Sequence, residues 1–308
     1  MSVFTRVERT QLEAFIATYD LGELIEFAGI SDGIVNTNYF VTTTTGRYVL
    51  TLFEELKPDE LPYFIALMRF AHEHSVPCAL PAVDRNGEYL RELCGKPALL
   101  VVRLSGGGVA RPNTVQCQQI GSALGALHRV GVKFSRHRET EHGSAWHAQT
   151  AAKVLTVISG ADAALLSAEM DFQGAQEYSE LPVGLTHGDL FRDNALFDGD
   201  TLSGIIDFYY ACDYILVHDL AVVVNDWCGC EDGSLDMQRA EVLMQAYQLE
   251  RPLDEKELAH WPAMLRAAAL RYWLSRLFDL YFPRPGEMTH AKDPNYFRQI
   301  LEQRIALS

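Results

Sequence analysis

Basic residues are scarce in this sequence of 308 residues: 26 Lys and Arg stand against 41 Asp and Glu, which gives a formal net charge of −15. Such a surface repels the phosphate backbone of nucleic acids, so we do not expect a nucleic-acid partner. An anionic nucleotide can still bind where backbone N–H groups and a divalent cation held by carboxylates attract it locally.

Long hydrophobic runs are also missing. The longest uncharged apolar stretches, such as 97–102 and 220–224, are far too short to cross a bilayer. Residues 1–15 include charged side chains among the apolar ones and lack the continuous apolar core of a secretory signal. We therefore expect a cytoplasmic protein that is not inserted in a membrane.

The six cysteines show neither paired C-x-x-C spacing nor neighbouring histidine ligands. Cys228 and Cys230 are close enough in sequence to hold a metal, but we favour the alternative that they are thiols. In a reducing compartment, buried thiols are the ordinary state of such cysteines.

A glycine cluster occurs at 106–108, directly after Ser105. It is not followed by Lys-Ser or Lys-Thr, and it does not complete a G-x-G-x-x-G register, so a hinge is favoured over a phosphate cradle. The chain exceeds the length at which one hydrophobic core keeps growing. We predict two lobes, formed by residues 1–102 and 103–308.

The first lobe has the pattern of a β-rich body. Residues 35–45 and 48–53 are dense in β-branched and aromatic side chains and predict a hairpin that turns at Thr45-Gly46. A helix is predicted over 59–74, with Asp59 as its cap, and two further strands over 88–93 and 96–104.

The second lobe is predicted to be mainly helical. Asn113 and Gln116 have the spacing of a capping box at a helix start, and Gly121 and Gly125 would allow close helix packing. Further helical patterns cover 237–247, 261–281 and 294–306, around one strand-rich patch at 184–207. The predicted fold is α+β and bilobal, with a small β-rich N-lobe holding one main helix and a larger, mainly helical C-lobe.

Chemistry is concentrated in that strand-rich patch. The strand pattern 183–186 leads into His187-Gly-Asp189-Leu-Phe-Arg-Asp-Asn194, and the apolar run 202–206 ends at Asp207. We expect these two strands to form a hairpin around a turn at 198–200, which would bring both polar ends together.

Asp189, Asn194 and Asp207 are the residue types that phosphoryl transfer to an alcohol requires. A carboxylate accepts the hydroxyl proton, and oxygen ligands hold the magnesium that screens the phosphates. The protein-kinase loop H-R-D-x-x-x-x-N has the same offset between its base and its Asn, and Asp207-Phe208 matches the start of D-F-G, with Tyr209 as a departure. Asp and Asn also populate ordinary turns, which is the alternative for each residue alone.

Three histidines near this patch are interpreted as structural. His187 is expected to fix the catalytic turn, and His128 and His218 to pack. Asp219 is predicted to brace the catalytic loop. In the first lobe, the small and polar residues of 29–38 could fold over a triphosphate, with an ordinary hairpin turn as the alternative.

The G-x-x-N-T-N-like loop, the H-G-D-L-x-x-D-N box and the I-D-F strand end together resemble the aminoglycoside-phosphotransferase and choline-kinase superfamily, over nearly the whole chain. Within it, four stretches look like bacterial homoserine kinases: 48–54, 207–213, 225–228 and 271–279. The resemblance implies transfer of the γ-phosphate of ATP to the hydroxyl of homoserine, in threonine biosynthesis, with Mg²⁺.

Residue roles follow from the resemblance. Asp189 would be the base, Asn194 and Asp207 the metal ligands, lobe 1–102 would bind the nucleotide, and lobe 103–308 would carry catalysis and the substrate. The nucleotide-binding residues would be Ser31, Asp32, Gly33, Val35, Asn36, Asn38, Val101, Arg103 and Leu104. The lysine of the third strand in typical kinases is replaced by Thr51, and neither Arg47 nor Lys57 can be assigned its role from sequence.

Homoserine carries a carboxylate and an ammonium, so its pocket should offer a guanidinium and a carboxylate. The candidate substrate residues are Asp226, Trp227, Arg271 and Arg276. Arg276 could instead pair with Asp279 on one helix, and Trp227 could be a core residue. The open alternatives are a kinase of choline, ethanolamine, a sugar or an aminoglycoside, and an inactive nucleotide-binding protein.

Overall fold

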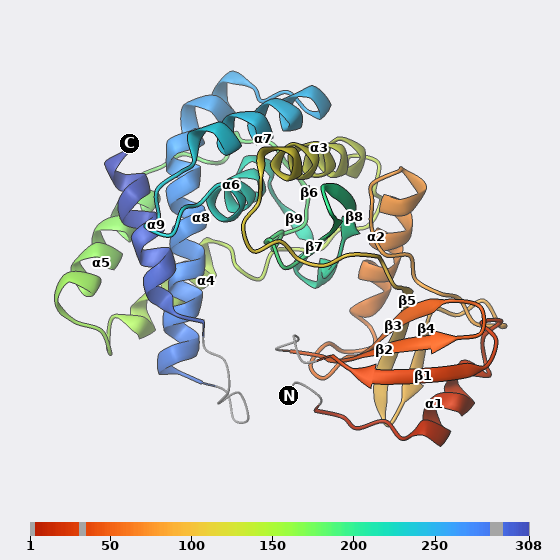
Figure 1. Cartoon of the computed structure of the whole chain (residues 1–308). Coiled ribbons are helices and arrows are strands. Elements are labelled where there is room, and N and C mark those ends of the chain that lie inside the picture. Colours follow the sequence, from red (N-terminus) through yellow and green to blue (C-terminus); the bar gives the residue numbers. More distant parts are fainter. Residues whose placement is uncertain (1–3, 31–34, 284–291, 308) are drawn as a thin grey trace. The chain divides into compact units, whose positions relative to one another are not determined.

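The computed structural model describes residues 4–30, 35–283 and 292–307 (Figure 1). The chain divides into two compact units. The first comprises Met1–Gly106, Leu196–Asp198 and Ser203–Ile206, and the second Gly107–Ala195, Gly199–Leu202 and Asp207–Ser308. The predicted boundary between residues 102 and 103, as a division of function, stays a prediction.

The first unit is built on an antiparallel sheet in the order β1-β2-β3-β5-β4. Its strands are β1 Leu24–Gly29, β2 Thr37–Thr43, β3 Arg47–Leu52, β4 Leu90–Leu93 and β5 Lys96–Val102. Burial alternates along β2, as expected for a strand with one face in the core. The predicted β2–β3 hairpin and the strands β4 and β5 are confirmed.

Two helices belong to this unit, α1 Arg9–Ile16 and α2 Leu61–Glu73. Leu12 of α1 is fully buried in one cluster with Tyr39 and Leu50 of the sheet, so α1 covers one face of the sheet. The helix predicted over 59–74 is confirmed as α2. Its predicted cap was wrong, because the N-cap position is Glu60 instead of Asp59, and Pro62 occupies the first turn.

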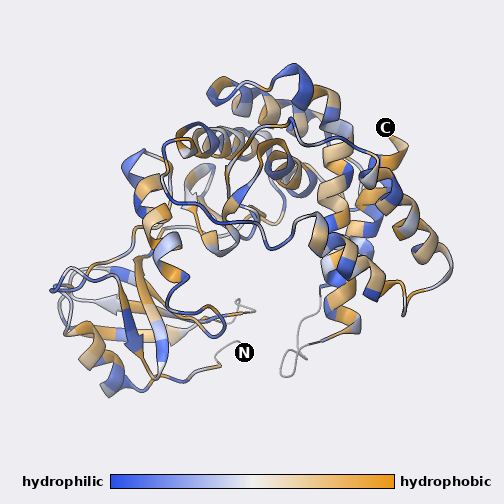
Figure 2. Cartoon of the chain, turned by 180° about the vertical axis from the view of Figure 1, so that it is seen from behind, coloured by the Kyte–Doolittle hydropathy of each residue, from blue (hydrophilic) through white to orange (hydrophobic). Residues whose placement is uncertain are grey.

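The second unit is mainly helical, as predicted. Its helices are α3 Thr114–Gly131, α4 Ser144–Val154, α5 Gly160–Gly174, α6 Leu216–Trp227, α7 Met237–Glu250, α8 Glu255–Tyr281 and α9 Pro294–Ala306. Figure 2 shows that the long helices mix hydrophobic and hydrophilic residues along their length. The predicted capping box of Asn113 and Gln116 is confirmed at the start of α3.

Helices α6 and α8 form the centre of this unit (Figure 1). Every residue of α6 is buried, and Asn225 of α6 donates a hydrogen bond of 2.8 Å from Nδ2 to the carbonyl oxygen of Leu265 in α8. Arg304 of α9 is buried and donates from Nε to Asn225 Oδ1 at 2.8 Å. These bonds satisfy polar groups that burial would otherwise leave unpaired.

Two pairs of short strands carry the predicted catalytic motif. Strand β6 Val183–Thr186 pairs antiparallel with β9 Cys212–Ile215, and β7 Ala195–Asp198 pairs with β8 Thr201–Ile205. The predicted turn at 198–200 is therefore correct, but the predicted partner of 183–186 was wrong. The short helix η1 Phe208–Tyr210 lies between β8 and β9.

The structure has no helix, among the residues described, that is long and apolar enough to cross a membrane.

Candidate active site

The catalytic loop begins at the end of β6, where Thr186 pairs with Cys212 of β9. Gly188 takes a left-handed conformation with φ of 78°, and a Cβ at this position would lie 2.7 Å from the carbonyl oxygen of Tyr210. A side chain at residue 188 would therefore be strained by its backbone angle and would also collide. The glycine lets the chain turn sharply and present Asp189.

Asp219 of α6 holds this turn. Its carboxylate accepts the backbone N–H of His187 at 2.8 Å and of Gly188 at 2.9 Å, and it lies 3.1 Å from Nε2 of His128. Burial raises the pKa of Asp219, but the hydrogen bond and charge of His128 outweigh burial, and the pKa lies below its usual range. The prediction that Asp219 braces the loop is confirmed.

Histidines 128 and 187 have structural contacts, in line with their interpretation. His128 is buried between Asp219 and the hydroxyl of Tyr247, which lies 2.8 Å from its Nδ1. The ring of His187 is fully buried against Phe208 with ring centroids 4.7 Å apart, and its Nδ1 accepts the Asp189 N–H at 3.3 Å.

Asp189, the predicted base, is held from two sides. The Tyr272 hydroxyl of α8 donates to Asp189 Oδ1 at 3.0 Å, and Asn194 Nδ2 lies 3.2 Å from Oδ2. Burial raises the pKa of Asp189 to about 7; Arg271 opposes this shift, and the charge of Asp207 adds to it. A carboxyl group with a pKa near neutrality is suited to proton transfer.

Asp207 and Asn194 both act on Asp189: Asn194 is hydrogen-bonded to its carboxylate, and the charge of Asp207 raises its pKa. Asp207 has φ of 63° and ψ of 56°, a left-handed conformation that is uncommon for a residue other than glycine and occurs often at functional sites. Asp207 as a residue is exposed, but the protein around its carboxyl group displaces water and raises its pKa to about 6, with a further contribution from Asp193 and an opposing hydrogen bond from the Tyr209 N–H.

The donor set fits magnesium. Asn194 commits its Nδ2 to the backbone oxygen of Asp189 at 2.8 Å and to the Asp189 carboxylate, and this leaves Oδ1 as an oxygen donor. Mg²⁺ in kinases takes one or two carboxylate or amide oxygens together with the phosphates of the substrate. Asn194 Oδ1 and the Asp207 carboxylate would supply the protein ligands.

Three of the predicted nucleotide-binding residues, Ser31, Asp32 and Gly33, lie outside the described residues. Asn36 Oδ1 lies 3.4 Å from the N–H of Glu54, and Asn38 Oδ1 accepts a hydrogen bond of 2.8 Å from the hydroxyl of Thr51. Thr51 of β3, which stands where the third strand of typical kinases carries a lysine, is therefore bonded to the neighbouring strand β2.

Of the other predicted nucleotide-binding residues, Val101 lies at the end of β5, Arg103 and Leu104 follow this strand, and Val35 precedes β2. Val101 pairs with Val49 of β3, and the Arg103 guanidinium stacks over the ring of Phe40 at 3.8 Å. Leu104 follows Arg103 and is half-buried, whereas Val35 is exposed.

Among the four predicted substrate residues, Asp226 and Trp227 hold the catalytic loop. Asp226 Oδ2 accepts the Arg192 N–H at 2.8 Å and lies 3.1 Å from Arg192 Nε. Trp227 is fully buried and donates from Nε1 to the carbonyl oxygen of Leu190 at 3.1 Å. Both α6 side chains thus fix the backbone that carries Asp189.

Arg276 and Arg271 both project from α8. Arg276 donates to the carbonyl oxygen of Asp293 at 3.1 Å and lies over the ring of Phe297 at 4.3 Å. Arg271 is buried, lies over the ring of Tyr272 at 4.2 Å, and lines a pocket that reaches Gly188 beside Asp189.

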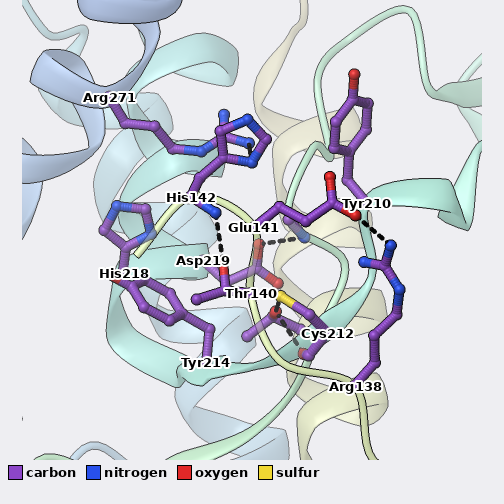
Figure 3. Close-up of a pocket in the computed structure, with 12 residues that line it drawn as sticks. Arg138, Thr140, Glu141, His142, Tyr210, Cys212, Tyr214, His218, Asp219 and Arg271 are labelled. Atoms are coloured by element: carbon purple, nitrogen blue, oxygen red, sulfur yellow. Dashed lines mark hydrogen bonds and ion pairs between the residues drawn. The ribbon is translucent and has the colours of Figure 1, made fainter. Parts of the chain in front are cut away.

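This pocket has a volume of about 20 Å³ (Figure 3). Its lining comes from the segment before α4, from β6 and β9, and from α6 and α8, and comprises Arg138, Thr140, Glu141, His142, Thr186, Gly188, Tyr210, Cys212, Tyr214, His218, Asp219 and Arg271. His142 and His218 were not predicted as site residues. The sequence interpretation gave His218 a packing role, and His142 lies 76 positions earlier without a motif that would have indicated it.

The structure combines a small antiparallel sheet with a mainly helical unit, and that unit carries Asp189 beside Asn194 and Asp207. This arrangement is typical of a phosphotransferase with a protein-kinase-like fold. The model of the "Phosphotransferase enzyme family" matches residues 26–271. The chain belongs to this family, and the prediction of a phosphotransferase is confirmed.

Curated relatives match over almost the whole chain. "Homoserine kinase" of Methylobacillus flagellatus is 48% identical over 99% of this chain and 96% of the relative, and "Homoserine kinase" of Neisseria meningitidis is 44% identical over 98% and 99%.

Solved structures share the fold at low sequence identity. An amicoumacin kinase in complex with AMP-PNP, Ca²⁺ and Ami has a TM-score of 0.72 and 15% identity, covering 98% of both chains. A spectinomycin phosphotransferase has a TM-score of 0.69 and 12% identity, covering 98% of this chain and 99% of the other. The predicted α+β, protein-kinase-like fold is confirmed.

Proposed function

We propose that the chain transfers the γ-phosphate of ATP to the hydroxyl of homoserine and forms O-phospho-L-homoserine. This reaction would belong to threonine biosynthesis and take place in the cytoplasm. The observation that carries this proposal is the position of Asp189: a half-buried residue whose carboxyl has a raised pKa, held by Tyr272 and Asn194 next to a pocket lined by a buried arginine. The names of the curated relatives supply the substrate.

In the proposed reaction, Asp189 accepts the proton of the acceptor hydroxyl. The hydroxyl oxygen forms a bond to the γ-phosphorus, the bond from that phosphorus to the β–γ bridging oxygen breaks, and ADP leaves. Asn194 and Asp207 would hold Mg²⁺, which neutralises charge on the phosphates when it is bound.

ATP binding is assigned to the residues expected from sequence. Ser31, Asp32, Gly33, Val35, Asn36 and Asn38 would contact the phosphates, and Val101, Arg103 and Leu104 would face the adenine. The hydrogen bond between Thr51 and Asn38 supports this assignment, because it fixes the amide of Asn38 on a strand next to the phosphate-binding loop.

A panel of alcohols tests the substrate. ADP release would be measured with homoserine, choline, ethanolamine, a hexose and an aminoglycoside at equal ATP and Mg²⁺. We expect homoserine to have the highest kcat/KM, by about 100-fold over the alcohols that lack a carboxylate, since losing paired charged groups costs a few kcal/mol. A higher kcat/KM for any other alcohol of the panel would overturn the proposal.

A further inference from the structure

Arg271 is a buried cation without a carboxylate partner among the described residues. Its side chain lies on α8 with 8% of the residue exposed, and its one hydrogen bond runs from Nη2 to Nδ1 of His142 at 3.4 Å. Of the other buried arginines of this unit, Arg266 binds the Glu169 carboxylate at 2.6 Å, and Arg304 donates two hydrogen bonds, to Asn225 Oδ1 at 2.8 Å and to the carbonyl oxygen of Gly233 at 2.9 Å. A buried guanidinium with most of its donors unused is costly unless an anion joins it.

The carboxylates that line the same pocket have other partners: Glu141 pairs with Arg138, and Asp219 is bound by His128 and by the loop N–H groups of residues 187 and 188. Burial, with Arg271 as the next cause, lowers the pKa of His142 to about 3, of His147 to about 4 and of His218 to about 3. All three imidazoles are therefore neutral at physiological pH. The charge of Arg271 lowers the pKa of Asp189, but the carboxylate oxygens of Asp189 are bound by Tyr272 and Asn194.

A buried nitrogen without a hydrogen-bond partner belongs to another residue of the same pocket. Nε2 of His218 is buried and has no partner within the described part of the chain, and 6% of the residue is exposed. Figure 3 shows His218 and Arg271 on the same side of the pocket. A neutral imidazole that carries its proton on Nε2 is a hydrogen-bond donor, so both side chains offer donors to one small space.

The size and position of the pocket fit one functional group of an acceptor. A volume of about 20 Å³ has room for a small polar group instead of a whole amino acid. Gly188, next to Asp189, forms part of its wall. A hydroxy acid with its carboxylate in the pocket and three carbon atoms before the hydroxyl, as in homoserine, can extend from Arg271 toward Asp189.

We propose that Arg271 and His218 form the subsite that binds the α-carboxylate of the acceptor, and that this subsite makes the enzyme selective for hydroxy acids. Arg271 supplies the charge, His218 Nε2 donates a second hydrogen bond, and His142 orients the guanidinium through its Nδ1. The inference rests on the proposed function, because it concerns the acceptor of the same reaction.

The test uses two analogues that each lack one group of homoserine. 3-Aminopropan-1-ol lacks the carboxylate, and 4-hydroxybutyrate lacks the amine. For the wild type we expect kcat/KM for 3-aminopropan-1-ol to be about 100-fold below that for homoserine, because charge-assisted hydrogen bonds to the carboxylate are lost. If 3-aminopropan-1-ol is used as well as homoserine, the inference is overturned.

Variants then locate the subsite. Arg271→Lys and His218→Phe should raise KM for homoserine and reduce the ratio of kcat/KM between homoserine and 3-aminopropan-1-ol, with KM for ATP unchanged. His147→Phe is the matched control, because His147 also has a buried, unpartnered Nε2 among the described residues but does not line the pocket. A ratio that stays at the wild-type value in both subsite variants contradicts the proposal. If neither variant folds, the wild-type comparison of the analogues decides.

Failure of the proposed function would look different. If the wild type prefers another alcohol of the panel to homoserine, the homoserine assignment fails. Choline, ethanolamine, a hexose or an aminoglycoside as the preferred alcohol also overturns the inference, because none of them carries a carboxylate. If the wild type instead prefers 4-hydroxybutyrate to homoserine, the homoserine assignment fails, and the inference is supported if Arg271→Lys reduces that preference and overturned if it does not.

Discussion

The hydroxyl of Tyr272 lies 3.0 Å from Oδ1 of Asp189 and 2.8 Å from the carbonyl oxygen of Gly188, so one side chain of α8 binds both the base and the turn that presents it. The Tyr272 ring is fixed in turn by Phe191, edge to face at 4.6 Å, and by Phe297, stacked at 5.2 Å. The orientation of Asp189 therefore depends on aromatic packing between the catalytic loop, α8 and α9.

Replacing Tyr272 with Phe removes this hydroxyl and keeps the ring packing. We expect kcat to fall about tenfold, because a positioned base loses one of the bonds that orient it, and stability to fall by about 1 kcal/mol. Steady-state kinetics and denaturant unfolding measure both effects, with KM for ATP expected to stay at the wild-type value. An unchanged kcat would show that Asp189 is positioned without Tyr272.

Gly121 of α3 lies where α3 packs against α7, as the sequence predicted. A Cβ at this position would overlap the backbone carbonyl oxygen of Leu243, and backbone atoms in a packed helix cannot move aside easily. We expect Gly121→Ala to destabilise the protein by about 1–3 kcal/mol, measured by denaturant unfolding.

Gly174→Ala is the matched control for this substitution. Gly174 ends α5, is exposed, and a Cβ there would meet no atom within 4 Å. Because alanine has the higher helix propensity, we expect unchanged or slightly higher stability, by up to about 1 kcal/mol. Equal effects of the two substitutions would contradict the close packing of α3 against α7.

The half-buried His147 makes stability depend on pH. Burial, and after it the charge of Arg271, lowers its pKa from 6.5 to about 4, so the unfolded chain binds a proton on this residue at a higher pH than the folded chain does. Stability is then complete above pH 6.5 and is lost as the pH falls from 6.5 toward 4, by about 1.4 kcal/mol per pH unit from this residue.

The variant His147→Phe isolates this contribution. Its free energy of unfolding, measured by urea titration at several pH values between 4.5 and 7.5, should decline less steeply toward acid than that of the wild type, by about 1.4 kcal/mol per pH unit. The slopes are compared instead of the absolute stabilities, because the substitution also changes packing. Parallel curves for the two proteins would show that His147 is protonated in the folded state.

The proximity of Asp189 and Asn194 could be predicted from sequence because it is local. Asp189 and Asn194 lie in one turn, and the chain must take a left-handed conformation at Gly188 to form it, so residue types and spacing carry the information. The α3 capping box of Asn113 and Gln116 was predictable for the same reason, since its two bonds join residues three apart.

Long-range features were not predictable in this way. Strand β6 pairs with Cys212–Ile215 instead of with the apolar run before Asp207, and a four-residue strand carries too little pattern to choose its partner. Helix α8 begins at Glu255, whereas the pattern suggested 261, and Pro262 lies inside the helix. The capping box of Asp254 and Glu257 was the signal that would have placed the start correctly.

The most direct test of the central claim is the formation of O-phosphohomoserine from homoserine and ATP, followed by phosphorus NMR, with the wild type and with Asp189→Asn. The asparagine keeps the shape of the side chain but cannot accept the proton. We predict wild-type turnover, a loss of about 10²–10⁴-fold in kcat for the variant, and ATP affinity unchanged in a binding titration. Equal rates for the two proteins, or no O-phosphohomoserine from the wild type, would contradict the account.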